Sequence, residues 1–267
     1  MTTTGTIGAA GSGPGLSGSR VSGSRLSGSR IRALVRKELN DYRRNRFIAT
    51  TMAIMPLVFM ITPVITIFKL PADTSAARLD SVVGLSVLYL TLVPALVPAV
   101  VASYAVVGER EQGTLEPVLT TPVRPAEFLL GKALAVFLPT IVISYAMYGV
   151  FLAAVALFAH QNVSQDIFEA PRVLTQLLFT PLVAGWSIWA GIAISTRTGD
   201  VRVAQQLGSL ASLPPLAVTA LIGFNVVKPS LTVALVLGCA LLVIDVLAWR
   251  LVSRMFHSER LLTGAKA

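Results

Sequence analysis

Long stretches without Asp, Glu, Lys or Arg recur along the chain. A helix needs about 20 residues to cross a hydrocarbon core about 30 Å thick, and five charge-free stretches exceed that length. A sixth apolar run carries Asp245 as its single charge. None of the runs alternates with a period of two residues, as the strands of a transmembrane β-barrel would. The pattern predicts an all-α membrane protein whose six transmembrane helices span about 47–68, 82–107, 133–159, 173–195, 207–227 and 231–249.

A basic amphipathic segment precedes the first of these helices. Apolar residues recur there at helical spacing, and Arg and Lys occupy the remaining surface. We therefore predict an interfacial helix at 31–46 that lies along the cytoplasmic face of the membrane. Such a helix is either a topology anchor or an element that contacts a partner. Its apolar positions are Ile31, Leu34, Val35, Leu39 and Tyr42.

The segment 108–132, between the second and third predicted helices, concentrates acidic residues. Glu109, Glu111 and Glu116 fall within eight positions, next to stretches without charge. Thr114 is a good N-cap for a short helix, which Thr121-Pro122 would end. A second helix start follows at Pro125, with Glu127 in its first turn. We interpret this charged segment as a docking surface for a soluble partner.

The same segment resembles the signature of the type-2 ABC transporter permeases. The resemblance extends to the basic helix before the first span, to the six-helix count and to cytoplasmic termini, and it omits only the Gly- and Ser-rich tail. It rests on the motif Glu109-x-Glu111-x-Gly113-Thr114-Leu115-Glu116, on Thr121-Pro122 with Glu127, and on Gly131-Lys132 before an apolar helix.

The resemblance implies a subunit that pairs with a second permease, identical or different, above two copies of a separate ATP-binding subunit. Transport would be export in most cases. Larger outer regions with dipping helices are frequent in the family, whereas Lys228-Pro229-Ser230 leaves little room here, so dipping segments would fall within 207–249. The residues that the resemblance places against the ATPase are Arg36, Lys37, Tyr42, Glu109, Glu111, Gly113, Thr114, Leu115, Glu116 and Leu119.

Charge sets the predicted orientation. Of the 22 Lys and Arg residues, 18 lie in the N-terminal segment, the 108–132 loop, the 196–206 loop and the C-terminal tail. Positive residues stay in the cytoplasm, so both termini are expected inside a multi-pass protein of the cell membrane. Residues 1–30, rich in Gly and Ser, form a disordered tail, and 251–267 a cytoplasmic one. The net charge of +9 favours anionic lipid as a further partner, and nucleic acid is not expected.

The sequence offers no chemistry for catalysis. The chain is 54% apolar and 13% charged, and its one Gly-Lys pair, Gly131-Lys132, lacks the rest of a phosphate-binding loop. His160 and His257 fall on opposite sides of the predicted membrane, so they cannot share a metal. We expect no cofactor on this chain, with ATP and Mg²⁺ bound by the partner, and therefore a transporter subunit rather than an enzyme.

Three residues inside the spans are candidates for the pathway or for structure. Asp245 either pairs with Arg250 or Arg254, or has a substrate or gating role. Trp186 and Trp189 share a helix face, so they either line a pathway or contact lipid. Spans so poor in charge favour a hydrophobic or amphipathic cargo: a drug, a lipid or a lipid-linked glycan. The alternative function is a self-contained secondary transporter or a membrane-embedded enzyme.

Overall fold

The computed structural model describes residues 27–71, 73–111, 113, 124–224, 226–227 and 230–263. Within these residues every element of regular secondary structure is a helix. The predicted all-α class is therefore confirmed. The helices are α1 (Gly28–Arg44), α2 (Arg46–Phe68), α3 (Ala76–Tyr104), α4 (Val107–Glu111), α6 (Pro125–Phe158), α7 (Gln161–Ile167), α8 (Ala170–Arg197), α9 (Val201–Ala211), α10 (Leu213–Gly223) and α11 (Leu231–Thr263).

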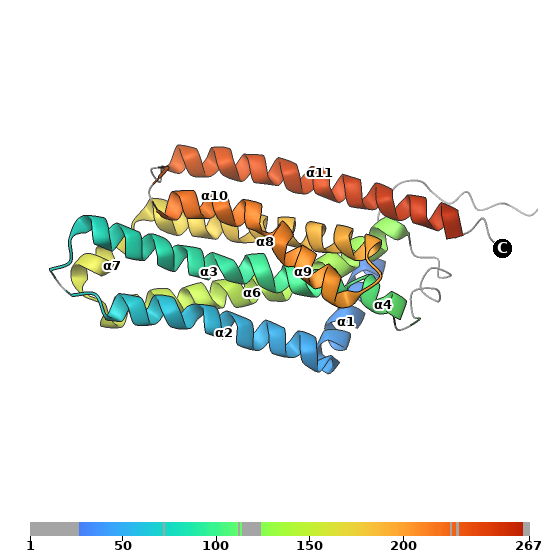
Figure 1. The fold of residues 1–267 in the computed structure, drawn as a ribbon, viewed down its shortest axis with the longest axis horizontal. Helices are drawn as coiled ribbons and strands as arrows, with labels where there is room; N and C mark the ends of the chain where they lie inside the picture. Colours follow the sequence, from blue (N-terminus) through green and yellow to red (C-terminus); the bar gives the residue numbers. More distant parts are fainter. Residues whose placement is uncertain are drawn as a thin grey trace, which may run out of the picture.

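The long helices form an elongated bundle (Figure 1). Within the described residues, six stretches are long and apolar enough to cross a membrane, which agrees with the predicted number. α3 packs against α2, α6, α8, α9 and α10, whereas α11 lies at the edge of the bundle against α8. The six stretches are Arg46–Phe68, Ala76–Glu111, Ala126–Phe158, Ala170–Arg197, Val201–Gly223 and Leu231–Met255.

The bundle has two ends that differ in content. One end, here called the α1 end, carries α1 and α4 together with the first turns of α2, α6 and α9 (Figure 1). The opposite end, here called the α7 end, carries α7 with the first turns of α3, α8 and α11. The described residues of the segment 108–132 therefore lie at the α1 end.

Local sequence explains where several helices begin. The Asn45 side chain accepts hydrogen bonds from the N–H groups of Phe47 and Ile48, so the chain turns from α1 directly into α2. α6 begins at Pro125 with Glu127 in its first turn, which confirms that predicted start. The predicted fifth helix is two helices, because the chain breaks at Ser212 and Pro214 and Pro215 fall in the first turn of α10.

Other boundaries differ from the expected ones. The first eight residues of α6 belong to the segment that was expected as a loop, and α11 continues beyond Trp249 to Thr263. α1 begins at Gly28, inside the expected tail. The described residues between α10 and α11 belong to no helix, so no dipping helix is seen there. The predicted short helix after Thr114 lies outside the described residues, as do Leu115, Glu116 and Leu119.

Candidate functional site: an ion cluster at the α1 end

A break between α3 and α4 fixes the position of the acidic segment. The backbone N–H groups of Val106 and Val107, at the start of α4, would lack partners within the helix. The buried hydroxyl oxygen of Ser195 on α8 accepts a hydrogen bond from each, at 3.0 and 2.9 Å. The end of α8 therefore holds the start of α4.

Two further contacts bind α4 to its neighbours. The Arg110 guanidinium donates to the carbonyl oxygens of Thr196 and Thr198, at 3.3 and 3.2 Å, where the end of α8 leaves acceptors unused. A carboxylate oxygen of Glu111 accepts a hydrogen bond of 3.3 Å from the N–H of Val201, at the start of α9. α4 thus joins α8 to α9 across the α1 end.

Lys132 is the centre of a cluster of buried charges. Its side chain is only 3% exposed, and its Nζ lies 2.9 Å from Glu109 Oε1 and 3.2 Å from Glu38 Oε1. The ring of Phe128 packs beneath the ammonium group, 5.0 Å from ring centroid to Nζ. One lysine of α6 therefore connects α4 with α1, and it lies 94 positions from Glu38 in the sequence.

Lys37 completes this ion cluster, which we define as Lys37, Glu38, Asp41, Glu109 and Lys132. Lys37 Nζ lies 3.4 Å from Glu38, 3.7 Å from Glu109 and 3.6 Å from Asp41. Partial burial lowers the pKa of Lys37, but the three carboxylates outweigh this, and the pKa is raised above its ordinary value. Lys37 stays charged at neutral pH, so the cluster sets two cations against three carboxylates.

A second contact holds α1 against α6. The side chain of Glu127 is 1% exposed, and its carboxylate accepts hydrogen bonds from the N–H of Ser27 at 2.8 Å and of Arg124 at 3.2 Å. Between this contact and the ion cluster, Gly131 lets α1 approach closely, because a Cβ there would lie 2.8 Å from the Cβ of Leu34. α1 is therefore held against α6 at two places, by Glu127 and by the ion cluster.

Tyr42 lies beside the cluster on the buried face of α1. Its side chain is 8% exposed, and its hydroxyl makes no hydrogen bond to the described residues. Burial raises the pKa of this phenol well above its ordinary value, and the neighbouring carboxylates of Glu38, Glu109 and Asp41 raise it further. Tyr42 is therefore neutral and contributes apolar area to the packing of α1 on the bundle.

The residues predicted to contact an ATPase are not all exposed. Arg36 and Glu111 are exposed at the α1 end, and Lys37 is half-exposed. Gly113 has a left-handed backbone with φ of 66°, and no described residue lies within 4 Å of where its Cβ would be. Glu109, by contrast, is turned into the ion cluster. Contact of these residues with an ATPase stays a prediction.

The residues that sequence reasoning missed had signals of their own. Lys132 is a lone cation directly before a charge-free stretch, which requires a nearby anion. Glu38 lies on the apolar face of α1, one turn after Leu34 and one before Tyr42, where an acid needs a partner. Nothing in the sequence indicated that these two residues pair. No feature of the sequence distinguished Ser195 from the other serines of the spans.

Asp245 does not pair with Arg250 or Arg254, because no ion pair joins it to any described residue. Five residues along a helix turn through about 140° beyond a full turn, so Arg250 points away from Asp245. Instead the carboxylate packs over Gly185, with Oδ2 2.8 Å from where a Cβ on that glycine would lie, and Oδ1 makes no hydrogen bond to the described part of the chain. Its role remains a prediction.

The two tryptophans of α8 make separate contacts. Trp186 donates from Nε1 to the carbonyl oxygen of Ala211, at 2.7 Å, beside the break between α9 and α10. Trp189 packs against Trp249 of α11, with ring centroids 4.9 Å apart. These contacts give both residues a structural use, and a place in a pathway stays a prediction.

The comparison with known protein families agrees with the helix arrangement described above. Residues 29–230 match the family model described as ABC-2 type transporter, and this range includes the ion cluster and five of the six candidate spans. Comparison with curated proteins finds no match. Since the family model covers well over half of the sequence, the chain belongs to the ABC-2 type transporter family and is a multi-pass membrane permease.

Proposed function

We propose that this chain is the transmembrane subunit of an ATP-driven exporter in the cell membrane. It pairs with a second permease subunit and docks on two copies of a separate ATP-binding subunit, which carries ATP and Mg²⁺. The observation that carries the proposal is the ion cluster. It ties Glu109, on one side of the signature segment, to Lys132 on the other side and to Glu38 of α1.

The cluster supports coupling because it makes one unit of three elements. The signature segment leaves α4 and returns to α6, and both flanks are held to each other through Lys132. α1 is held to α6 by Glu127 and to the cluster by Glu38. A partner that displaces the segment therefore displaces α1, α4 and α6 together. Coupling needs such a contiguous network with defined arrangements.

The charge distribution supports the orientation. The α1 end carries the basic α1 helix, and 18 of the chain's 22 Lys and Arg residues belong to segments at this end or continuous with it. Positive residues favour the cytoplasmic side, so the α1 end meets the ATPase and the α7 end faces outside. The cargo is hydrophobic or amphipathic, in keeping with spans that carry few charged groups.

The test is a comparison of the chain alone with the chain co-expressed with a candidate ATP-binding subunit. We expect the ATPase to co-purify with the chain, and ATP hydrolysis to appear only in the complex. Glu111→Lys replaces a negative charge with a positive one on the exposed docking surface. The new lysine would face the part of the ATPase that the glutamate contacts, and like charges at an interface cost several kcal/mol, so co-purification should fall. Asp73→Lys, an exposed acid outside every helix and adjoining the α7 end, is the matched control and should have no effect.

Two results would contradict the proposal. The first is equal co-purification of Glu111→Lys and Asp73→Lys with the ATPase. The second is ion-driven uptake, or ATP turnover, by the purified chain alone, which would favour the self-contained transporter or the membrane enzyme.

A further inference from the structure

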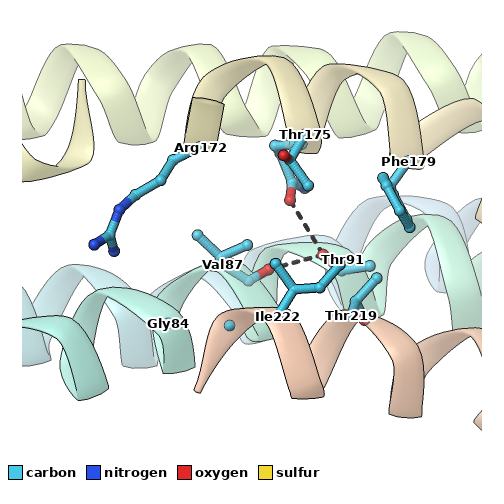
Figure 2. Close-up of a pocket in the computed structure, with 10 residues that line it drawn as sticks. Gly84, Val87, Thr91, Arg172, Thr175, Phe179, Thr219 and Ile222 are labelled. Carbon is cyan, nitrogen blue, oxygen red and sulfur yellow. Dashed lines mark hydrogen bonds between the residues drawn. The ribbon is translucent and has the colours of Figure 1, made fainter. Parts of the chain in front are cut away.

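A small cavity lies between α3, α8 and α10, in the half of the bundle nearer the α7 end, and most of its exposed surface is apolar. Its volume is about 30 Å³. Figure 2 shows Thr91 of α3 at its centre, between residues of α8 and α10. Val87, Phe179 and Ile222 form apolar walls, and the polar lining comes from Thr91, Thr175, Gln176 and Thr219, with Arg172 toward the α7 end.

The polar groups of this lining have unused hydrogen-bonding capacity. The hydroxyls of Thr91, Thr175 and Thr219 each donate to a carbonyl oxygen of their own helix, at 2.8, 2.6 and 2.8 Å, which leaves their oxygen lone pairs available. Gln176 is 4% exposed, and its amide oxygen lies 3.2 Å from the Thr91 hydroxyl. Its amide nitrogen makes no hydrogen bond to the described residues.

An amide nitrogen without a protein partner needs water or another polar group beside it, and this need is greater within a membrane. The cavity is large enough for water, which needs at least about 10–15 Å³ and two to four polar partners. A hydroxyl or carbonyl group of another molecule satisfies the same donors and acceptors. The cavity is therefore suited to a neutral hydrogen-bonding group.

The charges near the cavity disfavour an anionic ligand. Arg172 is already engaged by three carboxylates, with its guanidinium 2.7 Å from Asp80, 3.1 Å from Asp166 and 3.5 Å from Glu169. One cation among three acids leaves this end of the cavity with an excess of negative charge. Arg172 is thus a structural cation and does not attract an acidic ligand.

One wall of the cavity rests on a contact between two glycines. A Cβ added to Gly84 would meet the carbonyl oxygen of Gly223 at the end of α10, so the two backbones touch without any side chain between them. α10 is a separate helix that begins after the break at Ser212. The wall that α10 contributes to the cavity is therefore separated from α9 by this break.

We infer that this cavity is a subsite for the neutral polar group of the transported amphipath, such as an alcohol or an amide, and that it holds water otherwise. The amide of Gln176 and the hydroxyls of Thr91 and Thr219 make the hydrogen bonds, while Phe179 and Ile222 contact the adjoining apolar part. This inference deepens the proposed function and rests on it for the nature of the cargo.

The test measures water access and ligand binding in the membrane-embedded chain, without requiring transport or ATP hydrolysis. Cys239, the single cysteine, is replaced by Ser, and Thr219→Cys is introduced. Silver ions are thiol-specific and close to water in size, and they are applied from the α7 side before the remaining thiol is titrated. Thr180→Cys is the control, because Thr180 is 2% exposed, lies one turn from Gln176 and does not line the cavity.

We expect silver to consume the Thr219→Cys thiol at least about tenfold faster than the control, because buried thiols in apolar surroundings are inert. 1-Decanol should slow the reaction, whereas decane and decanoate should not. Gln176→Leu should abolish the protection by decanol. Thr175→Cys, which also lines the cavity, replaces Thr219→Cys if that variant does not insert.

Reaction no faster than that of Thr180→Cys would overturn the inference, since the cavity would then be closed to water. Equal protection by decane, or stronger protection by decanoate, would overturn the assigned ligand class. Failure of the proposed function would look different, because the silver reaction and its protection do not depend on an ATPase.

Discussion

The ion cluster and the cavity beside Thr91 place polar groups inside the same bundle in opposite ways. In the cluster, Lys132 is closely packed between Glu38 and Glu109, so both of those carboxylates have a cation within 4 Å. In the cavity, Gln176 and its neighbouring hydroxyls are uncharged and retain unused capacity. Buried charges must be partnered almost completely, whereas neutral groups can remain partly unpartnered at moderate cost. The first arrangement suits the transmission of movement, and the second suits a changing occupant.

The largest effect is expected from Lys132→Met. The substitution leaves Glu38 and Glu109 without their buried cation, and breaking a buried ion pair in this way costs about 3–5 kcal/mol. Thermal unfolding of the purified chain should show this loss. Lys69→Met, at the exposed lysine directly after the end of α2, is the control and should change stability little. Equal stability of the two variants would mean that the cluster is not a buried ion pair.

The next effect is expected from Gly84→Ala at the wall of the cavity. The new methyl group would overlap the Gly223 carbonyl, so α10 must move away from α3, at a cost of about 3 kcal/mol, toward the upper end for overpacking. The same change at Gly149, which has no atoms near its Cβ position, should be neutral or stabilising by up to about 1 kcal/mol. Thermal unfolding of both variants checks the difference. A stable Gly84→Ala protein would show that the two helices are not in backbone contact.

A smaller effect is expected from Ser195→Ala, which extends the comparison to a neutral group whose oxygen accepts two hydrogen bonds. Its loss leaves the N–H groups of Val106 and Val107 unpaired, at a cost of roughly 1–3 kcal/mol. Ser187→Ala on the same helix is the control, because the buried Ser187 hydroxyl makes no hydrogen bond to any residue that the structure describes. We expect a lower unfolding temperature for Ser195→Ala alone. If both variants unfold at the same temperature, Ser195 does not hold α4.

The smallest effect is expected from Gln176→Leu. When an apolar side chain of similar size replaces the amide, the Thr91 hydroxyl keeps its hydrogen bond to the Val87 carbonyl oxygen. No buried donor is left unpaired, so stability should stay within about 1 kcal/mol of the parent chain. Thermal unfolding measures this, with Lys132→Met as the contrasting variant. A loss as large as that of Lys132→Met would place Gln176 among the structural groups and remove the distinction between the two regions.

Sequence reasoning was most successful where one physical constraint dominates. Five charge-free stretches and one apolar run with a single charge, each about as long as a membrane is thick, predicted the six spans. Turn chemistry predicted the start of α6 at Pro125. The pairing of Glu38 with Lys132 could not be predicted from the sequence, because the two residues are 94 positions apart and no local pattern links them. The cavity was missed for a related reason. Thr91, Gln176 and Thr219 are ordinary polar residues within apolar spans, and only the packing of three helices brings them together.

The separation of Glu38 from Lys132 also has a consequence for biosynthesis. At about 5–20 residues per second, a ribosome adds Lys132 roughly 5–20 s after Glu38. Until then Glu38 has no lysine of α6 to pair with, and α1 has neither Glu127 nor Gly131 to dock on. α1 therefore cannot take its final place while the first two spans are being inserted. It can do so only when the third span is made, so the α1 end is completed late in the synthesis of the chain.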